Sequence, residues 1–282
     1  MSSYLDGILS WHRARAAEDR RDLETLARLA DAQLDGAPPT GTATAVTTGT
    51  TFSPRPFTAS LLGSDAPAII AEVKRRSPSK GDLDPDLDPA VMAVEYAEGG
   101  AACLSVLTDA RHFAGSPADL IAARGATTLP VLRKDFTVCA ADLYDARIMG
   151  ADAVLLIVAA LSDPELVSFL ALAEDLRLDA LVEVHDLTEV ERALSAGAGF
   201  VGVNQRDLRS FEVDTERAER LAGALLPGIV KVAESGIRSR HDVARLGEAG
   251  YDAVLVGELL VRSADRVGAV RALHAPVGEV RA

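Results

Sequence analysis

The 282-residue sequence is poor in cysteine, with only Cys103 and Cys139, and it has five histidines. Both cysteines lie within or beside apolar stretches, and their spacing matches neither a disulfide framework nor a set of zinc ligands. His112, His185 and His241 also lack the spacing of metal ligands. We therefore expect a reducing, cytoplasmic setting and no metal site.

Long apolar runs and an excess of positive charge are absent as well. The longest apolar run, 153–161, is far shorter than the roughly 20 residues that a membrane-spanning helix needs, and residues 1–24 are too charged for a secretory signal. Asp and Glu number 42 against 29 Lys and Arg, a formal net charge of -13, which would repel nucleic acids and anionic membranes. The expected partner is a small anionic molecule, and we expect a monomer or weak homodimer.

From about residue 68 onward, short aliphatic and β-branched runs alternate with amphipathic stretches, as in repeated βα units around a parallel sheet. Glycines follow several of the amphipathic stretches, where a helix would need a left-handed residue to end. The pattern predicts an α/β fold, a closed (β/α)8 TIM barrel. The expected strands are 68–73, 102–107, 129–134, 153–158, 180–185, 200–204, 229–234 and 252–257, and the expected helices include 89–98, 140–149, 164–176, 188–195, 215–225 and 240–249.

The N-terminal part differs from this pattern. Leucine and isoleucine recur at helical spacing before Gly36, which predicts an N-terminal helical extension over residues 1–35. Residues 36–58 are rich in Thr, Gly, Ala and Pro without helical periodicity, so we expect a linker or mobile lid there. The catalytic barrel is then expected over residues 59–282.

Ionisable side chains gather at the expected strand ends, where TIM barrels build their active sites. Glu72 and Lys74 are two residues apart, so both point to one side of the first strand, which we interpret as the barrel interior. Charged or amide side chains also end four other strands: Lys134, Glu183, Asn204 with Arg206, and Glu234 with Ser235. An isolated ion pair would explain one strand end, but the coincidence of several predicts an active site.

The fourth expected strand has only aliphatic side chains toward its end, Leu155 among them. Such side chains suit an apolar wall against an aromatic ring, to which Phe113 and Phe136 would add. The last two strands are followed by Ser235-Gly236 and Gly257-Glu258. Loops in these places commonly bind phosphate through backbone amides, and Ser77 would add a hydroxyl.

Eight long segments carry a family resemblance: IIAEVKRRSPSKGDL, LSVLTDARHFAGSPADL, LPVLRKDFTV, GADAVLLIVAAL, LVEVHDLTEVERAL, GVNQRDLRSFEVD, VAESGI and AVLVGELLV. Spanning residues 68 to about 263 in order, they resemble the signatures of the indole-3-glycerol phosphate synthase family. The resemblance implies a carbon-carbon lyase of the carboxy-lyase type, without metal or cofactor, in tryptophan biosynthesis. Its reaction converts 1-(2-carboxyphenylamino)-1-deoxyribulose 5-phosphate to indole-3-glycerol phosphate, carbon dioxide and water.

The resemblance also implies roles for single residues. The implied catalytic residues are Lys134, Glu183, Lys74, Glu72, Asn204 and Ser235. Substrate contacts are expected at Arg206, Glu234, Phe113, Phe136 and Leu155, and phosphate contacts at Ser77, Gly236, Gly257 and the backbone of Glu258. Three departures from the family pattern bear on loop packing and substrate access. They are Gln205 where many members carry Asn, Leu259 where a small residue is common, and residues 36–58, which are longer and more Thr-rich than usual.

In the implied reaction an aryl carbon attacks a ketone, and a positioned acid would stabilise the charge that develops on the ketone oxygen. Lys134 is the expected acid, and Glu183 is the expected base that removes the proton of the ring nitrogen. Lys74 would hold the carboxylate or protonate the departing hydroxyl.

Three alternatives stay open at this point. A phosphoribosylanthranilate isomerase would need a Cys and Asp pair at strand ends, whereas Cys103 lies in the middle of an expected strand. A non-catalytic phosphate-binding barrel would have no need of Lys134 or Glu183. The same reaction in a secondary-metabolite pathway would use the same residues.

Overall fold

The barrel is the centre of the protein, whose structure is a computed structural model that describes residues 4–34 and 52–274. Eight parallel strands form a closed ring in the order β1-β10-β9-β8-β7-β6-β5-β4. They are β1 (Ala68–Val73), β4 (Cys103–Leu107), β5 (Val131–Lys134), β6 (Ala153–Ile157), β7 (Asp179–Val184), β8 (Phe200–Asn204), β9 (Val230–Glu234) and β10 (Ala253–Val256). The predicted (β/α)8 fold is confirmed, and all eight expected strands are present.

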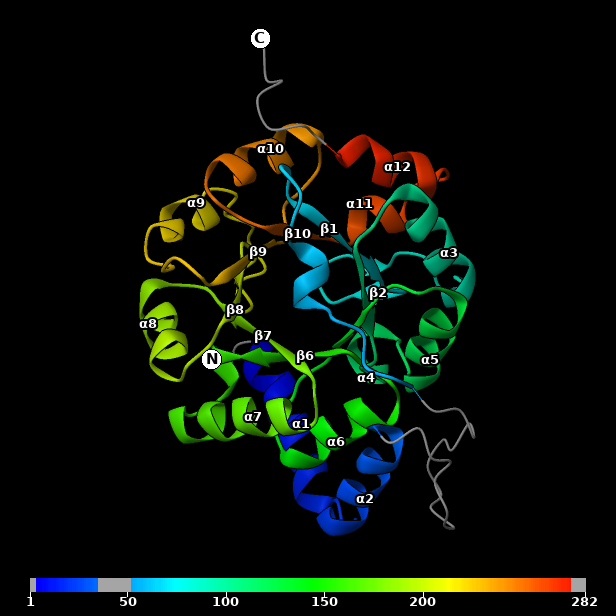
Figure 1. The fold of residues 1–282 in the computed structure, drawn as a ribbon, viewed down its shortest axis with the longest axis vertical. Helices are drawn as coiled ribbons and strands as arrows, with labels where there is room; N and C mark the ends of the chain where they lie inside the picture. The colour runs from blue at the N-terminus through cyan, green and yellow to red at the C-terminus, as the bar shows by residue number, and fades with distance from the viewer. Residues whose placement is uncertain (1–3, 35–51, 275–282) are drawn as a thin grey trace.

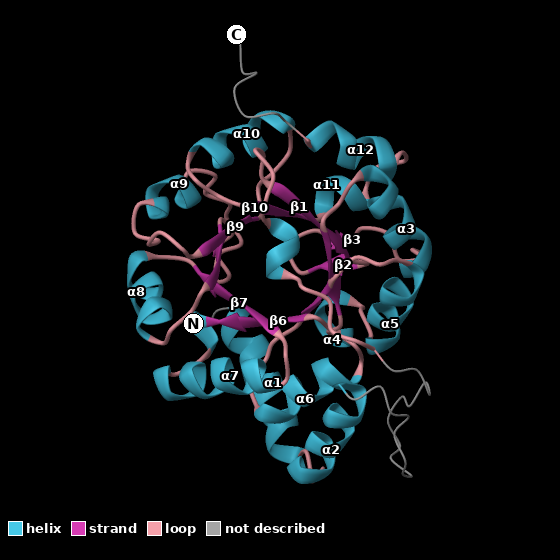
Figure 2. Cartoon of the chain, viewed as in Figure 1, coloured by secondary structure: helices cyan, strands magenta, loops and turns pink. Residues whose placement is uncertain are grey.

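Helices surround the strands, as Figure 2 shows in cyan around magenta. Local sequence sets their ends: Asp88 caps the first turn of α3 by accepting from the backbone of Ala90 and Val91, and Gly100 ends that helix with a left-handed φ of 96°. The outer helices are α3 (Pro89–Gly99), α4 (Ala110–Phe113), α5 (Pro117–Ala126), α6 (Ala140–Ile148), α7 (Asp163–Asp175), α8 (Leu187–Ser195), α9 (Arg217–Ala222), α10 (Arg240–Glu248), α11 (Glu258–Val261) and α12 (Arg266–Leu273). Two short strands, β2 (Arg76–Ser77) and β3 (Gly81–Asp82), pair after β1, and the 3-10 turn η2 (Val158–Ala160) follows β6.

Alternation along the strands divides the core into two layers. On β1, Ile69 and Ala71 pack outward against the helices, whereas Ile70 points into the barrel with Leu132 and Leu181. Each fully buried aliphatic side chain of this size stabilises the fold by about 1.5–3 kcal/mol. The two layers therefore fix which strand residues can reach the barrel mouth.

The N-terminal end of the barrel is covered by η1 (Thr58–Leu61), which Figure 1 shows at the centre of the ring. Phe57 is fully buried, and its ring lies 6.0 Å from that of Phe200 at the start of β8. Cys103 at the start of β4 donates its thiol hydrogen to the Phe57 carbonyl. Residues 36–51 of the segment expected to be a linker or lid lie outside the described residues, and its described end, 52–58, is packed against the barrel because Phe52 and Phe57 bury their rings there.

The N-terminal extension forms α1 (Tyr4–Glu18) and α2 (Leu23–Leu34), so the predicted N-terminal helices are confirmed. Helix α1 lies at the C-terminal end of the barrel, where Leu5 and Ile8 face the same cavity as the strand ends. Arg21, after α1, forms an ion pair of 2.7 Å with Asp145 of α6. None of the helices in the described ranges is long and apolar enough to cross a membrane.

Candidate active site

A cavity of about 1050 Å³ opens at the C-terminal end of the barrel. Thirteen of the predicted site residues line it: Glu72, Lys74, Ser77, Phe113, Lys134, Phe136, Asn204, Arg206, Glu234, Ser235, Gly236, Gly257 and Glu258. The other two do not. Glu183 is 1% exposed and lies behind Lys134, and Leu155 is 2% exposed within the barrel interior.

Lys134, at the end of β5, lies between two carboxylates. Its Nζ is 3.8 Å from Oε2 of Glu183 and 3.7 Å from Oε2 of Glu234. Burial lowers the pKa of Lys134, but the charges of Glu234, Glu183 and Glu72 outweigh burial and raise that pKa above its ordinary value. Lys134 is therefore protonated at neutral pH and can donate a proton or stabilise a developing anion.

The pKa values of the two glutamates beside Lys134 are shifted in opposite directions, although both side chains are buried. Burial and the nearby charge of Glu183 raise the pKa of Glu234 above its ordinary value. Burial opposes ionisation of Glu183 too, but the contacts with His185 and Lys134 outweigh it and lower the pKa of Glu183. The surroundings therefore favour the ionised form of Glu183 and the protonated form of Glu234.

His185 belongs to this site, although the sequence analysis did not place it there. Its Nε2 lies 3.4 Å from Oε1 of Glu183, and its Nδ1 lies 3.0 Å from Oε2 of Glu189. Burial lowers the pKa of His185, but the two carboxylates outweigh it and raise that pKa to about 10. The signal was available, because His185 is two residues after Glu183 and side chains two apart on a strand share a face.

Gly202, on β8, is a second residue that the sequence analysis missed. A Cβ atom at this position would overlap the Glu234 carboxylate and approach Leu181 to 3.1 Å. The position points into the barrel, between the inward-facing Phe200 and Asn204. A glycine here therefore makes room for the buried carboxyl group of Glu234 beside Lys134.

Glu72 and Lys74, on the same side of β1, form a direct charged hydrogen bond, as their spacing predicts. Gly257 lies against this pair: a Cβ atom at 257 would overlap the Glu72 carboxylate and lie 3.0 Å from Lys74 Nζ. The hydroxyl of Tyr96 donates to the Glu72 carbonyl from α3. The Glu72-Lys74 ion pair therefore packs directly against the α-carbon of Gly257, where a larger residue would not fit.

The glycine-rich end of the cavity lies after β9 and β10. Ser235 and Gly236 both have positive φ angles, 66° and 76°, and Gln205 donates from Nε2 to the Ser235 carbonyl at 2.7 Å. A serine in this conformation is strained, and such strain concentrates at functional sites. Three basic side chains line the cavity in addition to Lys74, Lys134 and Arg206: they are Lys80, Arg238 and Arg262. This end has the charge and the backbone geometry to hold an anion.

The opposite wall of the cavity is apolar. Leu5 and Ile8 of α1 line it together with Phe113 and Phe136. Between the two ends, the Asn204 side chain accepts a hydrogen bond from the Arg206 backbone, and Arg206 donates to the Phe211 carbonyl. One cavity therefore offers an apolar surface, a charged centre and an anion site.

The family model and the curated relatives point to one family. The family model described as "Indole-3-glycerol phosphate synthase" matches residues 32–273. A protein of that name from Parafrankia sp. (strain EAN1pec) is 54% identical, covering 70% of this chain and 74% of the relative. Indole-3-glycerol phosphate synthase 1 from Streptomyces coelicolor is 53% identical, covering 76% of this chain and 80% of the relative. Among solved structures, a thiamine phosphate pyrophosphorylase from Pyrococcus furiosus has a TM-score of 0.56 at 18% identity, covering 73% of this chain and 93% of that chain, which shows a shared fold alone.

Proposed function

Because the chain belongs to the indole-3-glycerol phosphate synthase family, we propose that its barrel mouth carries out the reaction of that family through Lys134, Glu183 and Lys74. The enzyme is a carboxy-lyase that converts 1-(2-carboxyphenylamino)-1-deoxyribulose 5-phosphate to indole-3-glycerol phosphate in tryptophan biosynthesis. The observation that carries the residue assignment is a cavity-lining lysine, Lys134, whose Nζ lies within 4 Å of two buried glutamates with oppositely shifted pKa values.

The substrate has three chemically distinct parts, and the cavity has a matching surface for each. The phosphate suits the end formed by Ser77, Gly236, Gly257 and the backbone of Glu258, where glycines let backbone amides approach an anion. The aryl ring suits the wall of Phe113 and Phe136. The ketone then falls between the two ends, within reach of the charged centre.

The chemistry requires a definite number of proton transfers. The aryl carbon attacks the ketone carbon, and the ketone oxygen takes up one proton to become a hydroxyl. The carboxylate leaves as carbon dioxide and returns its bonding electrons to the ring. The hydroxyl leaves as water with a second proton, and the forming five-membered ring loses one proton. Two protons enter and one leaves, which matches the one negative charge lost with the carboxylate.

Lys134 is the proposed donor to the ketone oxygen, because it is protonated and lines the cavity. Lys74 is the proposed partner of the substrate carboxylate and then the donor to the departing hydroxyl, since Glu72 holds it at the mouth of the barrel. Arg206 and Asn204 would orient the substrate between these groups, and Ser235 would position the loop beside the phosphate.

Glu183 is the proposed base. Its carboxylate does not line the cavity but forms an ion pair of 3.8 Å with Lys134 Nζ. Once Lys134 has given its proton to the ketone oxygen, its neutral amine can take the proton that the ring loses and pass a proton on to Glu183. His185 keeps Glu183 ionised and in place. Leu155 would then contribute to the support beneath the aryl wall.

The test is a fluorescence assay with the purified protein and the carboxyphenylamino-ribulose phosphate. We expect indole fluorescence to appear with release of one carbon dioxide per product, and no turnover of phosphoribosylanthranilate. Binding of the substrate without product would refute the catalytic proposal.

The remaining expectations concern the setting of the enzyme. We propose a cytoplasmic monomer or weak homodimer. We also propose that it binds neither nucleic acid nor membrane, because its net charge of -13 would repel both anionic partners. Analytical ultracentrifugation and a gel-shift assay test these statements.

A further inference from the structure

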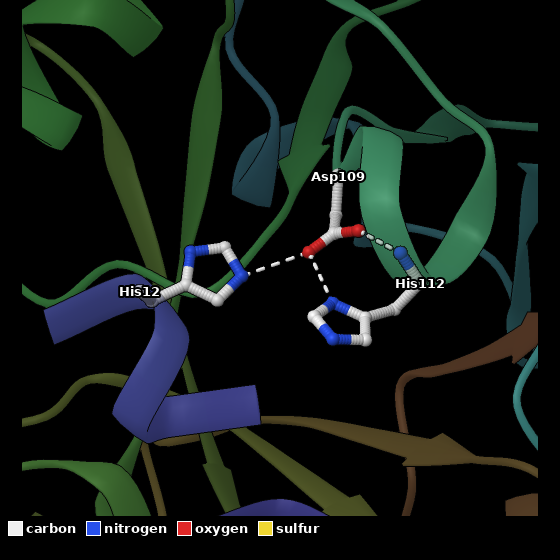
Figure 3. A group of neighbouring side chains, drawn as sticks. All are labelled: His12, Asp109 and His112. Atoms are coloured by element: carbon white, nitrogen blue, oxygen red, sulfur yellow. Dashed lines mark hydrogen bonds and ion pairs between the residues drawn. The ribbon is translucent and has the colours of Figure 1, made fainter. Parts of the chain in front are cut away.

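Asp109 stands out among the buried carboxylates near the barrel mouth. It follows β4, is 3% exposed, and forms its ion pairs in the described residues with two imidazoles, His12 and His112. Figure 3 shows both rings directed at the same oxygen, with Oδ2 lying 2.8 Å from His12 Nε2 and 2.9 Å from His112 Nδ1. Burial opposes ionisation of Asp109, but hydrogen bonds from His12 and His112 outweigh it and lower the pKa of Asp109.

The three ligand atoms lie within 4.8 Å of one another, and two imidazoles with a carboxylate are ligands that zinc accepts. A bound metal ion would oblige His12 to keep its proton on Nδ1. That buried nitrogen has no hydrogen-bond partner among the described residues, whereas metal-bound histidines almost always donate this proton to an acceptor. As a neutral donor through Nε2, His12 leaves only a lone pair unpaired, so the geometry favours a hydrogen-bond network over a metal site.

His12 connects α1 to the apolar wall of the cavity. Leu5, Ile8 and His12 share one face of α1, because they are three and four residues apart. Leu5 and Ile8 line the cavity. The His12 ring is fully buried, and its centroid lies 5.1 Å from that of Phe136. Phe136 lines the cavity two residues after Lys134.

We propose that His12 is a positioning residue for the aryl end of the substrate: its hydrogen bond to Asp109 fixes α1 and the Phe136 ring as one preformed wall. His12 itself does not line the cavity, so it acts through Phe136 and Ile8. Because this wall is ordered before the substrate binds, binding does not lose free energy in ordering α1 and the Phe136 ring. This inference rests on the proposed function, which supplies the aryl ring.

The test compares two probes that each occupy one end of the cavity, inorganic phosphate and 2-aminobenzoate, as competitive inhibitors. In His12→Leu, which keeps bulk but removes the donor, we expect the inhibition constant of 2-aminobenzoate and the KM of the substrate to rise by about tenfold, within the range of a lost charged hydrogen bond. The constant for phosphate should stay within about twofold. His12→Gln, which retains a donor near the Nε2 position, should recover most of the loss, and Asp109→Asn should reproduce the selective loss if His12→Leu does not fold.

Arg21→Leu is the matched control, because it removes an anchor of the N-terminal extension to α6 away from the cavity. It should leave both inhibition constants unchanged. The inference is overturned if His12→Leu weakens neither probe or both equally, if Arg21→Leu shows the same selective loss, or if elemental analysis of the dialysed wild-type protein finds a stoichiometric metal that His12→Leu lacks. A wild-type protein without turnover would refute the proposed function instead.

Discussion

The Nζ atom of Lys134 lies 3.8 Å from Oε2 of Glu183. Glu234 approaches the same Nζ to 3.7 Å from another strand. The pKa of Glu183 is lowered and that of Glu234 is raised. The two carboxyl groups therefore have different chemical roles, although their distances from Nζ differ by only 0.1 Å. Environments that separate the pKa values of neighbouring groups are how enzymes obtain acid and base from similar side chains.

This difference predicts unequal effects of two matched substitutions. Glu183→Gln should lower kcat by about a hundredfold or more, because the amide keeps the shape but cannot accept a proton. Glu234→Gln should lower kcat much less, because the surroundings of Glu234 raise its pKa and so favour the neutral form that the amide imitates. The measurement is kcat of each variant from steady-state kinetics at pH 7. Equal losses in the two variants would refute the assignment of different charge states.

The charge of His185 predicts a pH dependence of stability. Its pKa is about 10 in the folded protein, against about 6.5 in an unfolded chain. Because the folded state binds the proton more tightly, the stabilisation is complete below about pH 6.5 and is lost as the pH rises toward 10. Urea unfolding across this range should show a steeper fall in unfolding free energy for the wild type than for His185→Asn. The exposed His241→Asn variant should keep the wild-type slope; parallel curves for all three would contradict the ion pairs with Glu183 and Glu189.

Gly236→Val should weaken phosphate binding. The backbone there has a φ of 76°, and a Cβ atom would lie 2.9 Å from Val213 and 3.2 Å from Thr215, so the loop must shift. We expect KM to rise by about tenfold or more with kcat less affected, and inorganic phosphate to lose its ability to compete. Gly197→Val is the control, since its φ is also positive but open space surrounds it. If Gly236→Val kept its affinity for phosphate, the anion would bind elsewhere.

Gly257→Ala should act on the charged centre. The added methyl group would overlap the Glu72 carboxylate and crowd Lys74 Nζ, so the ion pair must move. We expect kcat/KM to fall by about tenfold or more. Gly125→Ala, on the exposed side of α5 with nothing within 4 Å, should leave kcat/KM unchanged and serves as the control. Unchanged kinetics in Gly257→Ala would show that the position of the Glu72-Lys74 pair does not matter for catalysis.

Alternation along the strands was enough to predict the fold and most of the cavity lining from sequence. The alternation correctly placed Glu72 and Lys74 on one side of β1, because side chains two residues apart on a strand point to the same face whatever their neighbours are. Depth along a strand was harder to predict. Lys134 is the last residue of β5 and lines the cavity, whereas Leu155 is two residues before the end of β6 and lies in the interior.

Contacts between distant segments were beyond sequence reasoning. The burial of Phe57 against Phe200 joins a segment of Thr-rich and Pro-rich composition to the base of the barrel. The contact of His12 with Asp109 spans 97 positions, and nothing in the spacing of either residue indicates the other. The need for glycine at position 202 could not be predicted either, because it comes from the Glu234 carboxylate on the neighbouring strand β9.

The central claim, that Lys134 is the acid for ring closure, is tested most directly by single-turnover fluorescence with Lys134→Ala in excess over substrate. Lys231→Ala is the control, because this lysine is on β9 but points out of the barrel, opposite in direction to Glu234. We expect the Lys231 variant to form product as the wild type does. The Lys134 variant should form none above the uncatalysed rate, while its substrate affinity stays within about tenfold because a general acid acts mainly on the transition state. Product formation at the wild-type rate by Lys134→Ala, or a loss of affinity with an unchanged rate of the bound substrate, would contradict the account.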